Sequence, residues 1–378
     1  MNMLYFLKFL WSTGTNMVRR VFPAYLAGFI DSAFLIGLIN TGYDIGKSMS
    51  LPCGFAVDKM GKVRAIMASF LLISIIAVLV SLTFNIAHLI FLFILIGVVS
   101  NLFYTSTNAL ISFQKKKTES IFKMEAFYQS GLFLGPIIGG FIISFYSMTL
   151  GLYAWAVLGI IGFIASLLLS KKEFVEEKKK DFSGFLDQFK KEKSRFFVIF
   201  LVGTVFTGFL FSTINLLIPL YAVSLGMAVY QAGLIFGFGA IVSTVGFFLL
   251  SKRFEKISPE KGIIITILLA GSMFLVLGNA YDIIILAVVF GLFNIGRGGS
   301  FAIARAFISK NTSQEMRSTG MAFLDTLHFS GGVVGSITTG LLIDLVSMQS
   351  VMLLSFSISV VGVFIILIYN LTGRKHAA

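Results

Sequence analysis

The residues with the clearest capacity for chemistry are Asp325 and His328, which lie three positions apart in an otherwise apolar stretch. Three positions are close to one helical turn, so both side chains would share a helix face that Gly332 and Gly335 continue. A carboxylate beside an imidazole can exchange protons near neutral pH. The spacing therefore predicts a proton-carrying pair. The alternative is that Asp325 only neutralises a buried arginine, for which Arg297 is the obvious candidate.

Two adjacent arginines lie in the first apolar stretch. Asn16, Arg19, Arg20 and Pro23 fall at i, i+3, i+4 and i+7, which places them on one polar stripe of a helix. Consecutive residues are about 100° apart around a helix axis. We therefore expect only one of the two arginines to point into a central cavity.

Other ionisable residues also interrupt apolar stretches. Asp44 and Lys47 are three apart, and the spacing favours a structural pair that neutralises itself. Arg297 is a second candidate binding residue, Arg305 is expected to extend to a membrane surface, and Glu125 is expected near a gate. The deeper cations exceed the deeper carboxylates by only one, which is too few to identify the charge of a substrate.

The composition excludes a soluble protein. Of 378 residues, 57% are hydrophobic and 12% are charged, whereas a soluble domain carries about 25% charged residues. A spanning helix needs about 20 apolar residues, and the runs lack the alternation of a β-barrel. The sequence predicts an all-α integral membrane protein with twelve spans, at residues 4–27, 33–57, 64–84, 87–112, 119–145, 148–170, 196–223, 228–250, 260–279, 281–308, 316–344 and 348–371.

Charge patterning predicts the orientation of these spans. The formal net charge is +13, and its lysines and arginines follow the even-numbered spans, whereas the other connections contain neither residue. Positive residues stay on the cytoplasmic side. The chain is therefore expected in the cell inner (plasma) membrane with both termini cytoplasmic, and the basic charge does not indicate a nucleic-acid partner.

An internal repeat indicates two homologous halves. The segment Gly131 to Gly140 returns at Gly331 to Gly340, and three further matches recur in the same order at offsets of 196 to 200. Parallel duplication is a known construction of secondary transporters. The expected domains are an N-terminal six-helix bundle at 1–170, a cytoplasmic linker at 171–195 and a C-terminal six-helix bundle at 196–378. The linker is expected to be a solvated tether or, alternatively, an amphipathic helix on the anionic inner leaflet.

The loop after the second span contains Gly54, Asp58, Gly61, Lys62 and Arg64. Its pattern resembles the cytoplasmic-loop signature of the major facilitator superfamily. The resemblance implies a gate, in which the aspartate docks against the start of helix 11 when the protein opens outward. An ordinary basic loop that follows the charge rule is the alternative.

The fifth span resembles the helix 5 signature of the drug:proton antiporters in that superfamily, through Gly131, Gly135, Pro136, Gly139 and Gly140. Glycines at every fourth position permit close helix packing. A further antiporter signature places an arginine in the fourth span four residues before a glycine. Counting back from Gly97 gives Phe93 instead, which puts proton coupling through that position in doubt.

These resemblances imply two pseudo-symmetric bundles with a substrate site at their interface and alternating access as the mechanism. We expect a monomeric, proton-coupled exporter of small hydrophobic or amphipathic compounds. The alternatives are uptake or exchange of a small organic anion, or a transport-dead sensor. No P-loop accompanies the spans, and the three histidines and one cysteine are isolated. The sequence therefore predicts no enzyme activity, no cofactor other than a proton gradient and no metal site.

Overall fold

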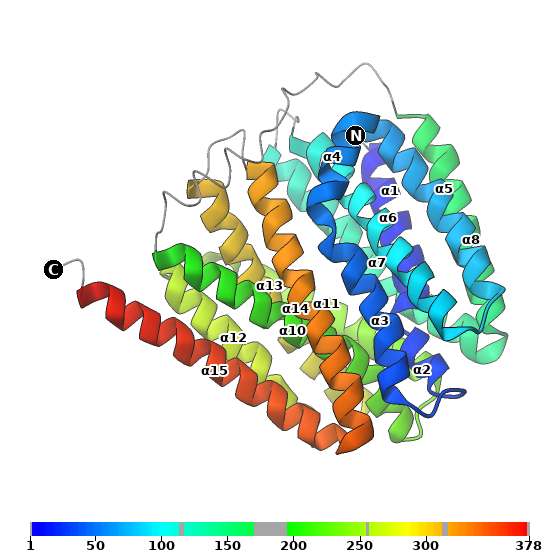
Figure 1. Cartoon of the computed structure of the whole chain (residues 1–378). Helices are drawn as coiled ribbons and strands as arrows, with labels where there is room; N and C mark the ends of the chain where they lie inside the picture. Colours follow the sequence, from blue (N-terminus) through cyan, green and yellow to red (C-terminus); the bar gives the residue numbers. More distant parts are fainter. Residues whose placement is uncertain (1, 113–116, 170–194, 255–256, 312–316, 376–378) are drawn as a thin grey trace.

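The computed structural model describes residues 2–112, 117–169, 195–254, 257–311 and 317–375, and the regular elements of this part are all α-helices. The predicted linker lies almost wholly outside the described residues. Helices before it form the first group and helices after it form the second group (Figure 1). The first group comprises α1 (Asn2–Arg19), α2 (Phe22–Leu26), α3 (Ala33–Ser48), α4 (Ser50–Met60), α5 (Lys62–Ser81), α6 (Ile86–Ser112), α7 (Lys117–Phe145) and α8 (Met148–Leu167). The second group comprises α10 (Arg195–Ser224), α11 (Val229–Phe254), α12 (Pro259–Leu277), α13 (Ile283–Asn311), α14 (Arg317–Leu345) and α15 (Met348–Lys375).

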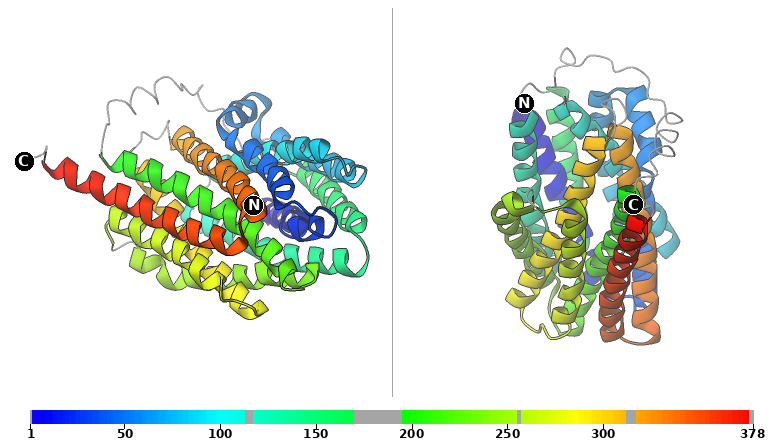
Figure 2. Two further views of the ribbon diagram at one scale, coloured as in Figure 1. Left: turned by 60° about the horizontal axis from the view of Figure 1, so that its bottom comes forward. Right: turned by 90° about the vertical axis from the view of Figure 1, so that its left-hand side faces the viewer.

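The helix contacts of the first group are repeated in the second. Helix α1 packs on α7 as α10 packs on α14, α3 packs on α6 as α11 packs on α13, and α5 packs on α8 as α12 packs on α15. The main contacts between the groups are also paired, because α3 packs on α14 and α7 packs on α11. Figures 1 and 2 show the two groups side by side, with α3 next to α14. The internal sequence repeat therefore corresponds to a repeat of packing.

The first two predicted spans are each broken into two helices. The span at 4–27 divides into α1 and α2, and Pro23 occupies the start of α2. The span at 33–57 divides at Met49 into α3 and α4. Pro52 has no N–H to donate to the preceding turn, which weakens the helix at that point. The other ten predicted spans are single helices.

The apolar outer surface fits a bilayer. Ten helices in the described part are long and apolar enough to span a membrane. Large hydrophobic side chains lie exposed along them, including Phe248 at 83% and Ile284 at 73%. Contiguous exposed apolar surface of this extent marks a membrane contact. The protein is a multi-pass membrane protein.

The two groups lie closer together at one end of the molecule (Figure 1). That end carries the connections without lysine or arginine, at residues 28–32, 146–147 and 345–347 among others. The charge rule predicts that it faces outward, and it is called the outer end below. Helix α15 diverges from the first group towards the opposite end (Figure 1).

Candidate functional site

A buried carboxylate joins the two groups between α3, α10 and α14. Asp44 of α3 is 2% exposed and accepts hydrogen bonds from the hydroxyls of Ser212 at 2.6 Å and Ser336 at 3.2 Å. Ser336 in turn accepts a bond from the Asn40 amide at 2.8 Å. The structural pair predicted between Asp44 and Lys47 is wrong. The two side chains have different neighbours, and the Asp44 carboxylate is hydrogen-bonded to the second group.

The outer end is held by two matching contacts. Asp344, near the end of α14, accepts bonds from the backbone N–H groups of Ala33 at 2.8 Å and Phe34 at 3.0 Å, and from the Ser32 hydroxyl. A carboxylate at a helix N-terminus satisfies free N–H groups and opposes the positive end of the helix dipole. At the related position of α7, the Ser144 hydroxyl accepts a bond from the backbone N–H of Tyr230, at the start of α11. We call these contacts the Asp344 latch and the Ser144 latch.

The two adjacent arginines have different surroundings. The Arg20 guanidinium is buried and donates to the side-chain oxygens of Asn16 and of Asn215 in α10. It therefore bridges the two groups. The Arg19 guanidinium instead lies over the Tyr43 ring, 4.4 Å from its centroid. Only Arg20 faces the second group through a hydrogen bond.

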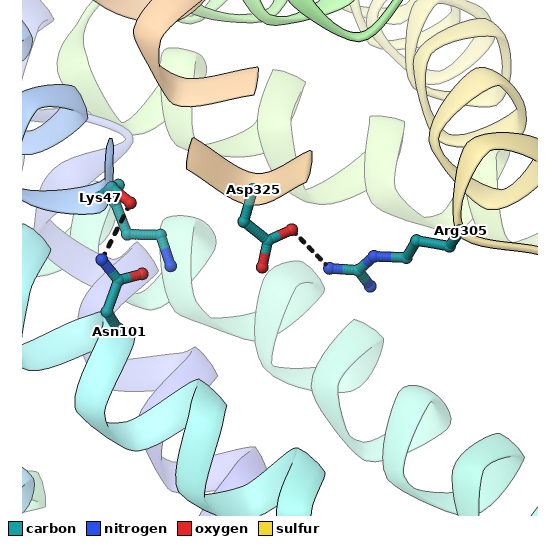
Figure 3. A network of polar contacts seen from close by, with 4 residues as sticks. All are labelled: Lys47, Asn101, Arg305 and Asp325. Carbon is teal, nitrogen blue, oxygen red and sulfur yellow. Dashed lines mark hydrogen bonds and ion pairs between the residues drawn. The ribbon is translucent and has the colours of Figure 1, made fainter. Parts of the chain in front are cut away.

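The carboxylate of Asp325 forms an ion pair within the second group. It lies 2.9 Å from the Arg305 guanidinium of α13, and the two side chains are 23% and 41% exposed (Figure 3). The expected partner Arg297 instead lies over the Phe211 ring at 4.3 Å. The expectation that Arg305 only extends to a membrane surface is therefore wrong. Its guanidinium turns inward because α13 and α14 bring a carboxylate within reach.

The imidazole of His328 does not contact Asp325. His328 is 1% exposed and neither ring nitrogen has a hydrogen-bond partner. Its neighbours are three phenylalanines whose ring centroids lie 5.0 to 5.6 Å away: Phe211, Phe301 and Phe329. Each of these rings also carries a cation, as Arg297, Arg305 and Lys47 lie over Phe211, Phe301 and Phe329 respectively. Asp325 and His328 lie on the same helix, but their side chains have different neighbours.

Two lysines lie beside one tyrosine in the first group. The ammonium of Lys8 in α1 is 4.2 Å from the centroid of the Tyr104 ring, and that of Lys47 in α3 is 4.6 Å from the same centroid. Both residues are buried, at 4% and 5% exposed. Asn101 donates to the Lys47 backbone carbonyl, and in Figure 3 the Lys47 ammonium extends towards Asp325. Lys8 was not among the predicted site residues, although a lysine within the first apolar span was a signal for it.

The glycines of the fifth span form two packing surfaces. A Cβ at Gly131, Gly135 or Gly139 would meet the backbone or side chains of α1, and one at Gly140 would meet the backbone of α11. The helix continues through Pro136, whose carbonyl lies against α11 at Gly233. The related glycines of α14 pack in the same way on α10 and α3. The predicted close approach of helices is confirmed, and it extends to the other group.

The loop signature lies at the junction of α4 and α5. Gly61 ends α4 with a φ of 89°, a conformation that favours glycine. A Cβ at Gly54 would meet no atom within 4 Å, so Gly54 does not serve helix packing. Asp58 and Arg64 are exposed and Lys62 is partly exposed. Helix α4 contacts α14, but residues 312–316, which precede α14, lie outside the described residues.

Two further predicted positions are peripheral to these contacts. Glu125 is exposed and accepts a bond from Gln129 at 2.9 Å on its own helix. Phe93, at the place of the antiporter arginine, is 3% exposed and stacks on Phe22 with ring centroids 5.1 Å apart. The antiporter arginine is thus replaced by an aromatic contact between the first and fourth spans. In the described residues, no cluster of histidine, cysteine and acidic side chains could hold a metal ion.

Comparisons with known proteins agree with this architecture. The sequence model of the Major Facilitator Superfamily matches residues 4–278 and 253–377. The quinolone resistance protein NorA of Staphylococcus aureus is 26% identical over 99% of this chain and 96% of its own length. The multi-drug resistance efflux pump PmrA of Streptococcus pneumoniae is 26% identical over 88% of this chain and 86% of its own.

Two solved structures share the fold at low sequence identity. The nucleoside transporter NupG superposes with a TM-score of 0.76 at 16% identity, covering 98% of this chain and 99% of NupG. A bacterial homologue of the human lysosomal transporter Spinster, in an inward-facing and occupied conformation, gives 0.76 at 14% identity, covering 99% and 96%. At this identity the likeness establishes the arrangement of helices and leaves the cargo open.

Proposed function

We propose that this chain exports small amphipathic compounds in exchange for protons. The chain belongs to the major facilitator superfamily and is a membrane transporter rather than an enzyme. Relatives named as a quinolone resistance protein and a multi-drug efflux pump support the direction and the class of cargo. The single observation that carries the mechanism is the polar joint at Asp44, where a buried carboxylate of one group is held by hydroxyls of the other.

Alternating access requires that the interface between the two groups can adopt two arrangements. The contacts between the groups run along two helix pairs, α3 with α14 and α7 with α11. The hydrogen bonds across the first pair extend from the Asp344 latch to Asp44, eleven residues or about 17 Å along α3. This bonding closes the outer half of the interface, and its release would allow the groups to rock about the site.

Proton coupling is assigned to Asp325 and Asp44. An ionised carboxylate only accepts hydrogen bonds, whereas a protonated one also donates. Protonation of Asp325 would remove its ion pair with Arg305, and protonation of Asp44 would change the bonds that Ser212 and Ser336 donate. Both steps alter contacts between helices, so proton binding would bias the conformation. His328 would act only as a neighbour of this switch, since its ring contacts phenylalanines.

Everted membrane vesicles test the function without knowledge of the cargo. Respiration acidifies their interior, and a compound exchanged for protons discharges that gradient, which an acridine dye reports. We expect discharge by some members of a panel of amphipathic cations, zwitterions and anions, and none with Asp325→Asn. The exposed Glu125→Gln is the matched control and should retain exchange. No discharge by any compound would refute proton-coupled export.

The orientation and the assembly state are part of the same proposal. A position in the inner membrane with cytoplasmic termini is supported by the lysines and arginines that follow the even-numbered spans. A fluorescent protein fused after Ala378 should fold and fluoresce, and an alkaline phosphatase fused there should be inactive. The protein should run as a monomer by light scattering in detergent. An active phosphatase fusion would reverse the orientation.

A further inference from the structure

The interior carries more positive charge than its carboxylates balance. The six buried or partly buried cations are Lys8, Arg19, Arg20, Lys47, Arg297 and Arg305, and the two buried or partly buried carboxylates are Asp44 and Asp325. The surplus of four is larger than the surplus of one that the sequence indicated. Burying an unpaired charge costs several kcal/mol, and ionisable groups inside a membrane mark binding paths. A surplus that the protein does not neutralise indicates a ligand of opposite charge.

The surplus is concentrated at Lys8 and Lys47. Both ammonium groups face the Tyr104 ring, at 4.2 and 4.6 Å from its centroid, so they lie within about 9 Å of each other. Neither ammonium has a hydrogen-bond or ion-pair partner among the described residues. Asp325 pairs with Arg305, and the exposed Glu125 carboxylate bonds to Gln129 on its own helix.

The surroundings of these lysines are aromatic. The Lys8 ammonium also lies 5.5 Å from the Tyr128 ring centroid, and the Lys47 ammonium lies 5.0 Å from that of Phe329 in the second group. Ring faces partly compensate a cation, but they form no charged hydrogen bond. An incoming carboxylate or phosphate would supply one, whereas an incoming ammonium would add like charge.

We propose that the cargo is an organic anion, with its carboxylate or phosphate bound between Lys8 and Lys47 and its apolar body against Tyr104 and Phe329. This inference rests on the proposed function for the movement of the compound but not for its binding. Phe329 belongs to α14 and the lysines to the first group, so the bound anion would touch both groups. The site therefore lies where rocking of the groups would change it.

Thermal shifts of the purified full chain in neutral detergent test this binding. The probe is 1-naphthaleneacetate, and its uncharged match is 1-naphthaleneacetamide. We expect the acid to raise the melting temperature in a saturable manner and the amide to have little effect. Lys8→Gln and Lys47→Gln should each raise the Kd about tenfold, because each removes one charged hydrogen bond. The exposed Lys261→Gln at the start of α12 is the control and should bind as the parent does.

Two further experiments distinguish misfolding from loss of binding, and an anionic lipid from a soluble ligand. Lys8→Arg keeps the charge and should retain binding even if Lys8→Gln misfolds. Phosphatidylglycerol added to the detergent micelles, with phosphatidylcholine as the zwitterionic control, tests an anionic lipid headgroup. A Lys8-dependent shift with this lipid, and none with naphthaleneacetate, would overturn the cargo proposal. Equal shifts with the acid and the amide, or unchanged binding in both glutamine variants, would also overturn it.

The vesicle assay separates this inference from the proposed function. Proton-coupled discharge by cations, with no binding of naphthaleneacetate, leaves the exporter and removes the anion site. Lysine-dependent binding of naphthaleneacetate, with no discharge by any compound, supports the anion site and removes proton-coupled export. Discharge by naphthaleneacetate that is lost in Lys47→Gln supports both.

Discussion

The carboxylate of Asp44 accepts a 2.6 Å hydrogen bond from the hydroxyl of Ser212, and this contact joins α3 of the first group to α10 of the second. The accepting carboxylate is buried, so water would not compensate for loss of this bond. The joint therefore links the ionisation of one side chain to the packing of the two groups.

Loss of charge at Asp44 should impair transport more than stability. Asp44→Asn retains an oxygen that accepts from Ser212, so we expect a melting temperature close to the parent and at least about tenfold slower exchange. Ser212→Ala should cost about 1 kcal/mol of stability by removing one bond. Vesicle discharge and thermal unfolding measure the two effects. Parental exchange in Asp44→Asn would remove Asp44 from the coupling mechanism.

Neutralising Asp325 should abolish proton coupling with little loss of fold. Its ion pair with Arg305 is partly exposed, and such pairs contribute about 0 to 1 kcal/mol. Asp325→Asn should therefore melt within a few degrees of the parent while exchange no longer follows the pH gradient. Counterflow of a labelled cargo at equal pH is the discriminating measurement. A variant that still follows the gradient would assign coupling elsewhere.

A methyl group at Gly139 should be poorly tolerated, since the added Cβ would overlap the backbone carbonyl of Met17. Overpacking of this kind costs about 1 to 3 kcal/mol, so Gly139→Ala should lower the melting temperature and the yield of monodisperse protein. Gly54→Ala is the matched control, because a Cβ there would meet nothing within 4 Å. Equal yields from the two variants would contradict the packing at Gly139.

The Asp344 latch should hold the outer end closed more strongly than the Ser144 latch. A carboxylate that accepts two backbone N–H bonds forms stronger bonds than a hydroxyl that accepts one. In a Cys53→Ser background, spin labels at Phe29 of the first group and Tyr281 of the second, which are both exposed, should report a wider outer end for Asp344→Ala than for Ser144→Ala. Identical distance distributions in both variants would show that the charge adds nothing.

Removing the unpaired cation at Lys8 should stabilise the empty protein. Methionine matches the length of lysine and avoids the desolvation cost, and replacing buried charges by apolar groups is often neutral or stabilising. Lys8→Met should raise the melting temperature without ligand, by on the order of 1 kcal/mol in stability, and should lose the shift with naphthaleneacetate. The control Lys261→Met should change neither. A destabilised Lys8→Met would indicate that the ring contacts alone hold the ammonium.

The sequence determined the membrane spans, because span length and apolar content respond to bilayer thickness and are local properties, but it did not predict the breaks within the first two spans. It also determined the repeat, since equivalent glycines of the fifth and eleventh spans recur at an offset of 200. The close packing at Gly139 and Gly335 was therefore predictable, because the absence of side chains at every fourth position lets another helix approach closely.

Only the tertiary structure decided the partners of the charged residues. Helical spacing placed Asp44 beside Lys47 and Asp325 beside His328, but Asp44 bonds to Ser212, which is 168 positions away, and Asp325 pairs with Arg305 on the neighbouring helix. A side chain on one helix has several neighbours at similar distance, and packing against other helices selects among them. The placement of Lys8 beside Lys47 has the same origin, because α1 and α3 meet Tyr104 from separate parts of the chain.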